Sequence, residues 1–203
     1  ITTCASGIKL EKEFGVSTKE SEVAKLDTII QSSNYLSKTI DDFRNFFKPN
    51  KEKNYFSIEE MTEQSISLIN ASFAFHYIKI NKNFANIEKV FGFPNEFSQA
   101  ILNVLANAKD VLVQKEIENP QVNINIYENE EFGFLEIEDN GGGINPNILI
   151  KIFEPYFTTK EKNQGTGIGL YMSKMIVEKN MSGKLTVINT SIGAKFIFAI
   201  PKE

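Results

Sequence analysis

The feature that most restricts the fold of this chain is an apolar seam near its N-terminus. Successive positions of the seam are alternately three and four residues apart, and neither Gly nor Pro interrupts it. It consists of Leu26, Ile29, Ser33, Leu36, Ile40, Phe43 and Phe47, with Ser33 as its one polar member. Such spacing suits an amphipathic helix on a core of its own, or a helix of a bundle. The length of the seam favours the bundle or a coiled coil.

Sequence signals mark both ends of the helix that carries the seam. Ser17 and Glu20 have the spacing of a capping box. Pro49 ends the helix, because proline lacks a backbone donor and clashes with the preceding turn. Residues 1–14 also read as a helix, with Gly15 as its C-cap. We therefore expect a helical hairpin over residues 1–48.

The two arms of this hairpin differ in length. At ~1.5 Å per residue the second arm measures about 45 Å and the first about 21 Å. Because antiparallel arms should match, we expect about fifteen further residues upstream of Ile1, in a longer parent protein. A single hairpin buries little apolar surface, so two should pair as a dimeric four-helix bundle.

A polar linker over residues 49–54 separates the hairpin from a second domain over residues 55–203. The periodicity there predicts both helices and strands, and hence an α+β domain with helices on one face of a sheet. The expected helices are 58–74, 95–115 and 170–179, and the expected strands are 77–80, 87–91, 122–127, 134–139, 185–189 and 194–200.

Composition excludes several classes of protein. A formal net charge of −4 argues against a nucleic-acid binder, which needs a basic face. The one cysteine, Cys4, excludes a disulfide framework and a cysteine-based zinc site. No apolar run is long enough to span a bilayer. We expect a cytoplasmic fragment without membrane contact, which leaves open an anchor elsewhere in the parent protein.

The first stretch whose residues suggest a binding or catalytic site lies in the predicted helix 95–115. Asn103 and Asn107 are four residues apart, so both side chains point from one face. Amide oxygens among apolar neighbours need partners, and Mg²⁺ accompanied by phosphates would supply them, since Mg²⁺ prefers oxygen ligands. Two solvated asparagines on a helix edge are the alternative interpretation.

Two glycine-rich stretches follow. Residues 139–144 (DNGGGI) come directly after a strand, where Asp139 is suited to accept a hydrogen bond from an exocyclic amine. An acidic hairpin turn is the alternative, although Pro146 favours a loop that enters a helix. Residues 165–170 (GTGIGL) open a helix, whose free N–H groups and dipole favour phosphate. Their spacing is neither that of a dinucleotide fingerprint nor that of a P-loop.

An aromatic stretch, residues 153–160 (FEPYFTTK), lies between the two glycine-rich stretches, and a polar run that reads as a mobile loop follows it. In this order the four stretches resemble the N, G1, F and G2 boxes of the sensor histidine kinases. The resemblance covers residues 95–200, and the hairpin is similar to the dimerisation and phosphotransfer helices of that family. It implies an α/β sandwich of the histidine-kinase and gyrase ATPase type, with ATP and Mg²⁺ as ligands.

The resemblance also implies a role for each matching residue. Asn107 would be the Mg²⁺ ligand, with Asn103 and Asp110 on the phosphate side. Asp139 would bind the adenine amine in a pocket shaped by Gly141, Gly143 and Ile144. Asn103 and Lys160 would be the catalytic residues. The implied lid and phosphate-binding residues are Phe157, Thr159, Lys160, Gly165, Thr166, Gly167, Ile168, Gly169 and Leu170.

The reaction that the resemblance implies is transfer of the ATP γ-phosphoryl group to a histidine upstream of this fragment. From there it would pass to an aspartate of a response-regulator receiver domain, in a homodimeric two-component kinase. Related ATPases carry Glu at the position of Asn103, where it activates water, and Asn cannot take up a proton. Transfer to a protein nucleophile is thus favoured over hydrolysis.

Two departures from the family pattern concern His76 and Ala194. His76 is the one histidine, and it is expected on a strand edge as a structural or solvent-facing residue. The fragment is therefore not expected to phosphorylate itself. Ala194 follows Gly193 where the family often has Thr, which predicts weaker adenine binding or another water partner.

Two other functions share these features. The first alternative is a nucleotide-sensing dimeric scaffold, or a degenerate kinase that signals by conformation alone. The intact glycine-rich stretches argue against it, because an inactive site has no physical need for them. A serine kinase that acts on a separate regulator shares the fold, but the attached helical hairpin disfavours it.

Overall fold

The computed structural model describes residues 2–46, 52–160 and 165–202. The chain divides into two compact units, one formed by residues 1–48 with 158–166 and the other by residues 49–157 with 167–203. Within the described ranges, no helix has both the length and the apolar character needed to cross a bilayer.

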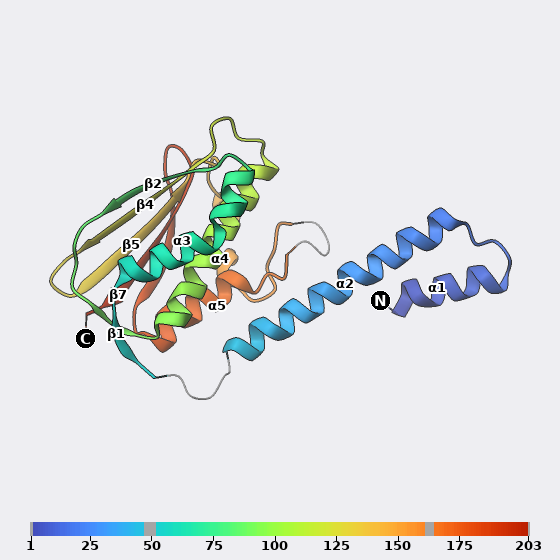
Figure 1. Ribbon diagram of the computed structural model, residues 1–203, viewed down its shortest axis with the longest axis horizontal. Helices are drawn as coiled ribbons and strands as arrows, with labels where there is room; N and C mark the ends of the chain where they lie inside the picture. The colour runs from blue at the N-terminus through green and yellow to red at the C-terminus, as the bar shows by residue number, and fades with distance from the viewer. Residues whose placement is uncertain (1, 47–51, 161–164, 203) are drawn as a thin grey trace. The chain divides into compact units, whose positions relative to one another are not determined.

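The first unit contains the predicted helical hairpin with unequal arms, α1 (Thr2–Glu13) and α2 (Lys19–Phe46) (Figure 1). Gly15, at φ +66°, ends α1 in a Schellman turn, as predicted. Its N–H donates to the Lys12 carbonyl (3.2 Å), and the Val16 N–H donates to the Glu11 carbonyl (3.0 Å). The positive φ at Gly15 lets the chain reverse direction between the two arms.

The capping box predicted from Ser17 and Glu20 is wrong by one residue. The Thr18 hydroxyl accepts from the Ser21 N–H at 3.1 Å, so Thr18 caps α2. Ser17 instead bonds the Glu22 carboxylate. Both Ser and Thr form caps, so sequence alone did not decide between adjacent positions.

Polar contacts join the two arms of the hairpin, and apolar side chains remain on its surface. Glu11 of α1 pairs with Lys25 of α2 and accepts from the Ser21 hydroxyl at 3.1 Å. The seam residue Leu26 is 48% exposed. The predicted end at Phe47 and Pro49 lies outside the described residues, and the four-helix bundle remains a prediction.

The second unit is built on a five-stranded sheet. Its strand order is β2-β4-β5-β7-β6, with β2 parallel to β4 and all other pairs antiparallel. The strand bounds are β2 Lys79–Phe84, β4 Gln121–Glu128, β5 Phe132–Asp139, β6 Lys184–Asn189 and β7 Ala194–Pro201. The predicted alternation in β4 is confirmed, since Val122, Ile124 and Ile126 are all buried.

Helices cover one face of this sheet, as Figure 1 shows. They are α3 (Ile58–Phe75), α4 (Pro94–Gln114) and α5 (Gly169–Met175), which continues as the π-helical turn η3 (Ile176–Asn180). The apolar face predicted for α4 is confirmed as the centre of the core. Its buried members are Phe97, Ala100, Ile101, Val104, Leu105, Ala108 and Leu112.

Two predicted strands have different bounds in the structure. The segment predicted at 77–80 begins at Lys79 as β2, and the one predicted at 87–91 is the short β3 (Val90–Gly92). β3 pairs with β1 (Asn54–Phe56), which begins inside the predicted linker. These short strands carry too few residues for a period to be visible.

His76 caps the C-terminal end of α3, so its expected place on a strand edge is wrong. Tyr77 follows at φ +55° and donates to the Ala74 carbonyl at 3.1 Å, while the Ile78 N–H donates to the Phe73 carbonyl at 2.9 Å. This is a Schellman turn with tyrosine where glycine is usual, and it left no glycine signal in the sequence.

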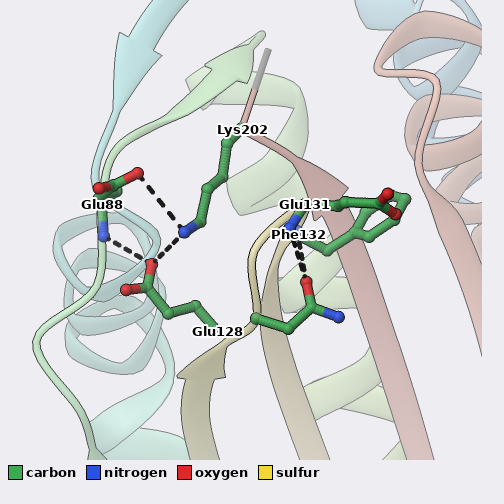
Figure 2. A network of polar contacts seen from close by, with 6 residues as sticks. Glu88, Glu128, Glu131, Phe132 and Lys202 are labelled. Carbon is green, nitrogen blue, oxygen red and sulfur yellow. Dashed lines mark hydrogen bonds and ion pairs between the residues drawn. The ribbon is translucent and has the colours of Figure 1, made fainter.

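A polar network connects Lys202, which follows β7, to Glu88 and Glu128 (Figure 2). The Lys202 ammonium lies 3.0 Å from Glu128 and 3.4 Å from Glu88, and the Glu88 N–H donates to Glu128 at 2.9 Å. These partners lower the pKa of Glu128, the Glu88 N–H most of all. The network lies beside Phe132, at the end of β5 opposite to Asp139.

Candidate functional site

Asp139 is the last residue of β5 and is only 5% exposed. Its Oδ1 accepts from the Gly141 N–H at 2.8 Å and from the Ala194 N–H at 3.4 Å. Burial raises its pKa, and the two N–H groups and the charge of Lys115 oppose that rise. In the described part of the chain both hydrogen bonds to this carboxylate go to Oδ1, so Oδ2 is the oxygen that can accept from a ligand.

Gly193 makes this arrangement possible. A Cβ at residue 193 would overlap the carbonyl oxygen of Asp139 and come within 2.7 Å of its Oδ1. Only glycine therefore lets the turn between β6 and β7 lie against the end of β5. That close approach brings the Ala194 N–H within reach of the carboxylate.

The glycine-rich stretch after Asp139 forms a loop that leads into a helical turn. Gly142 and Gly143 adopt φ of +78° and +77°, in the left-handed region that favours glycine. The 3₁₀ turn η1 (Pro146–Ile148) follows, and the Asn145 side chain caps it. The prediction of a loop that enters a helix is confirmed, and the alternative hairpin turn is excluded.

This glycine loop, residues 140–145, is held from both sides. The Lys115 ammonium, at the end of α4, donates to the Gly141 carbonyl at 2.6 Å. On the other side, the Gly142 N–H donates to the Ile192 carbonyl in the β6–β7 turn at 3.0 Å. Asn140 bonds the segment before β4, because its amide donates to the Asn119 carbonyl at 3.1 Å.

Asn103 links α4 to the start of α5. Its amide nitrogen lies 3.2 Å from the Gly169 carbonyl and 3.2 Å from the Ser173 hydroxyl, which in turn donates to Gly169 at 2.9 Å. Asn103 thus fixes the position of the last predicted glycine-rich stretch. Asn107 and Asp110 lie further along α4 and are half-buried, with the Lys109 ammonium 3.6 Å from Asp110.

Close contacts also require glycine where α5 begins. Gly167 has φ +65°, and a Cβ there would lie 2.7 Å from the Phe157 carbonyl oxygen. Ile168 is buried as the N-cap, and α5 begins at Gly169, one residue earlier than predicted. The half-buried Gly169 and Leu170 therefore form the first turn of α5.

Four of the predicted residues belong to the first unit, namely Thr159, Lys160, Gly165 and Thr166. Within that unit the Lys160 N–H donates to the Thr158 hydroxyl at 3.1 Å, and a Cβ at Gly165 would lie 2.9 Å from the same hydroxyl. The predicted lid between Lys160 and Gly165 lies outside the described residues. The roles of these four residues remain predictions.

The magnesium site predicted from the sequence would need most of its ligands from outside the protein. In the described part of the chain, no three His, Cys, Asp or Glu side chains gather as a metal site would require. A hard cation could instead take one amide oxygen from the protein and its other oxygens from phosphates and water. Asn107, half-buried on α4 one turn from Asn103, is suited to supply that oxygen.

Sequence reasoning missed Lys115 and Asn189, which both hold the glycine loop. Asn189, the exposed last residue of β6, accepts from the Ile144 N–H at 2.8 Å. It also donates to the Ile144 carbonyl at 2.7 Å. The one sequence signal for Asn189 is an asparagine at a strand end before Thr190, which reads as an ordinary turn residue.

Comparison with known protein families gives one match over more than half of this chain. Residues 92–203 match the family described as histidine kinase-, DNA gyrase B- and HSP90-like ATPase. The chain belongs to this ATPase family. The match includes α4, the glycine loop, α5 and the β6–β7 hairpin, which are the elements that surround Asp139.

Individual relatives place the chain with the sensor histidine kinases. It is 42% identical over 115 residues to the two-component sensor PprA of Pseudomonas aeruginosa. The alignment covers 55% of this chain, which spans only 12% of the length of that relative.

Solved structures agree with this placement. The catalytic domain of the histidine kinase ThkA is similar with a TM-score of 0.66 and 26% identity, over 74% of this chain and 98% of that domain. ThkA in complex with the response regulator TrrA has the same fold, with a TM-score of 0.72 and 20% identity, over 100% of this chain and 57% of that one. The α/β sandwich of the histidine-kinase type is therefore confirmed as the fold of the second domain.

Proposed function

We propose that this chain is the ATP-binding catalytic region of a sensor histidine kinase together with part of its dimerisation hairpin. The proposed domains are residues 1–48 for the hairpin, 49–54 for the linker and 55–203 for the catalytic domain. Its reaction is the transfer of the ATP γ-phosphoryl group to a histidine upstream of residue 1. The single observation that carries the proposal is the buried carboxylate of Asp139 beside a backbone loop that only glycines can form.

Asp139 recognises the adenine ring. An exocyclic amine that donates to Oδ2 would satisfy a carboxylate oxygen that is otherwise desolvated, and this gain stabilises the complex. Guanine presents a carbonyl oxygen at the same place, so two acceptors would face each other. A site built around a buried hydrogen bond of this kind rejects the wrong partner by ~10⁴-fold or more.

The phosphates bind on the side of α4 and α5. Gly167 and Gly169 lie at the start of α5, where N–H groups and the helix dipole attract anions. Asn107, with Asp110 nearby, would hold Mg²⁺, which would supply positive charge against the phosphates. By resemblance to the family, we also assign Thr159, Lys160, Gly165 and Thr166 to phosphate binding, and Asn103 and Lys160 to catalysis.

Asn103 favours phosphoryl transfer over hydrolysis. Its amide cannot take a proton from water, and its nitrogen is already bonded to Gly169 and Ser173. Catalysis then comes from positioning and charge neutralisation, as in other phosphoryl transfers. The solved complex of ThkA with TrrA supports a response-regulator receiver domain as the next acceptor, and the exposed seam residue Leu26 supports a homodimer.

Transfer to a supplied acceptor tests the proposal. The 203-residue chain is mixed with radiolabelled ATP, Mg²⁺ and a separately produced histidine-kinase hairpin that contains the acceptor histidine. We expect label on the hairpin and none on this chain, and the hairpin with Gln in place of its histidine should stay unlabelled. In a separate titration, absence of ADP binding by the folded chain would refute the nucleotide site. Label on this chain in the transfer experiment would refute an upstream acceptor.

A further inference from the structure

The side-chain amide of Asn189 forms two hydrogen bonds with the backbone of Ile144, in the pattern in which two paired strands bond to each other. The amide oxygen accepts from the Ile144 N–H at 2.8 Å and the amide nitrogen donates to the Ile144 carbonyl at 2.7 Å. One side chain thus satisfies both backbone groups of a loop residue, as a neighbouring strand would. A primary amide offers the adjacent donor and acceptor that this arrangement needs.

Gly143 makes room for this amide. A Cβ on residue 143 would lie 2.8 Å from Oδ1 of Asn189 and 3.1 Å from its Cγ. Gly143 also has φ +77°, so the loop needs glycine there for two separate reasons. The asparagine and the glycine therefore form one unit, because the side chain of one occupies the space that a side chain of the other would take.

The turn that follows Asn189 also contacts Asp139. Ala194 donates to the Asp139 carboxylate, Gly193 lies against the Asp139 carbonyl, and Ile192 accepts from the Gly142 N–H. The β6–β7 turn accordingly holds both the carboxylate that recognises the base and the loop beside it. Asn189 lies just before this turn, and its side chain reaches the far end of the loop at Ile144.

We propose that Asn189 is a positioning residue for base recognition, fixing the glycine loop so that the adenine pocket is formed before the nucleotide arrives. The inference rests on the proposed function and adds a residue that acts through Ile144. Without Asn189 the loop samples other conformations, and the nucleotide must order it on binding. This ordering reduces affinity because it consumes binding free energy.

The first test is ADP affinity by isothermal titration calorimetry on the 203-residue chain. Asn189→Ala should weaken ADP binding roughly tenfold, the loss expected for two exposed hydrogen bonds. It should also lower the preference for ADP over GDP, which a merely structural role would not change. Asn83→Ala, an exposed asparagine on β2, is the matched control and should bind ADP like the parent chain. Unchanged ADP affinity in folded Asn189→Ala would overturn the inference.

The second test is a double-mutant cycle with Gly143→Ala. In the parent chain this change introduces both the contact with Asn189 and the strain of a positive φ. In the Asn189→Ala background the contact is absent and only the strain remains. The loss of ADP affinity caused by Gly143→Ala should therefore be smaller there, by roughly threefold or more. Additive effects would overturn the inference, whereas a folded parent chain that binds no ADP would refute the proposed function instead.

Discussion

Replacing Asp139 by asparagine should separate recognition of the base from stability of the fold. Asn keeps the size of the side chain and one oxygen, which can still accept from the Gly141 and Ala194 N–H groups. The second oxygen becomes an NH₂ group. In place of an acceptor for the adenine amine, the pocket then presents a donor to another donor.

The size of the effect follows from the burial of Asp139. A hydrogen bond to a charged group contributes about 1.5–3 kcal/mol, and a buried donor left without a partner costs about 1–3 kcal/mol more. Together these effects predict that ADP affinity falls by roughly 10²–10⁴-fold. The melting temperature should not fall, because burial raises the pKa of Asp139 and its ionised form is therefore a cost to the folded state at neutral pH.

Calorimetric titration with ADP and thermal unfolding, both at neutral pH, measure the two effects on the same sample. Asp27→Asn, an exposed aspartate on α2, serves as the control for loss of one charge. GDP gives a further check, since the new NH₂ group can donate to the guanine carbonyl, and the preference for ADP should shrink. An Asp139→Asn protein that folds and binds ADP within roughly threefold of the parent would refute the assignment of the adenine pocket.

Three further substitutions and one change of pH probe the proposed nucleotide site. Gly193→Ala would place a Cβ against the Asp139 carbonyl, so both the melting temperature and ADP affinity should fall, measured by thermal unfolding and calorimetry. Asn107→Ala should make nucleotide affinity nearly independent of Mg²⁺ in titrations with and without the ion; retained dependence would point to another ligand. ADP affinity should fall on acidification as Asp139 takes up a proton, at a pH above the ordinary aspartate range. Lys115→Met should move that fall to higher pH, because the Lys115 charge lowers the pKa of Asp139.

Periodic elements were predictable from the sequence because many residues repeat one signal. The buried apolar face of α4 has seven members at helical spacing, β5 and β7 alternate over eight residues each, and β4 alternates as far as Tyr127. The hairpin arms were predictable for the same reason, together with Gly15 at the turn. Ambiguity arose at the ends, where Ser17 and Thr18 are equally good caps and only the surrounding contacts decide.

Elements that depend on one unusual residue left no such signal. Tyr77 and Glu116, at φ +55° and +49°, end α3 and α4 in Schellman turns where glycine would be expected. The hydrogen bonds between Lys115 and Gly141 and between Asn189 and Ile144 join residues that are 26 and 45 positions apart in the sequence. Neither contact follows from local spacing, because each depends on how the sheet brings distant segments together.

The glycines around Asp139 show why the glycine-rich stretches identified the region of the site but not the contacts that build it. Glycines 142 and 143 need a positive φ, which a local reading of the loop suggests. Gly193 has another requirement, since its missing Cβ lets a turn 54 residues away approach Asp139, whose Oδ1 accepts from Ala194. The arrangement around the carboxylate therefore depends on glycines from two segments for different reasons. The loop needs their conformational freedom, and the β6–β7 turn needs the space that the missing Cβ leaves. Substituting alanine tests the two requirements separately. At Gly142 it should strain the loop and leave the Asp139–Ala194 contact in place, whereas at Gly193 it should break that contact while the loop keeps its own backbone conformation.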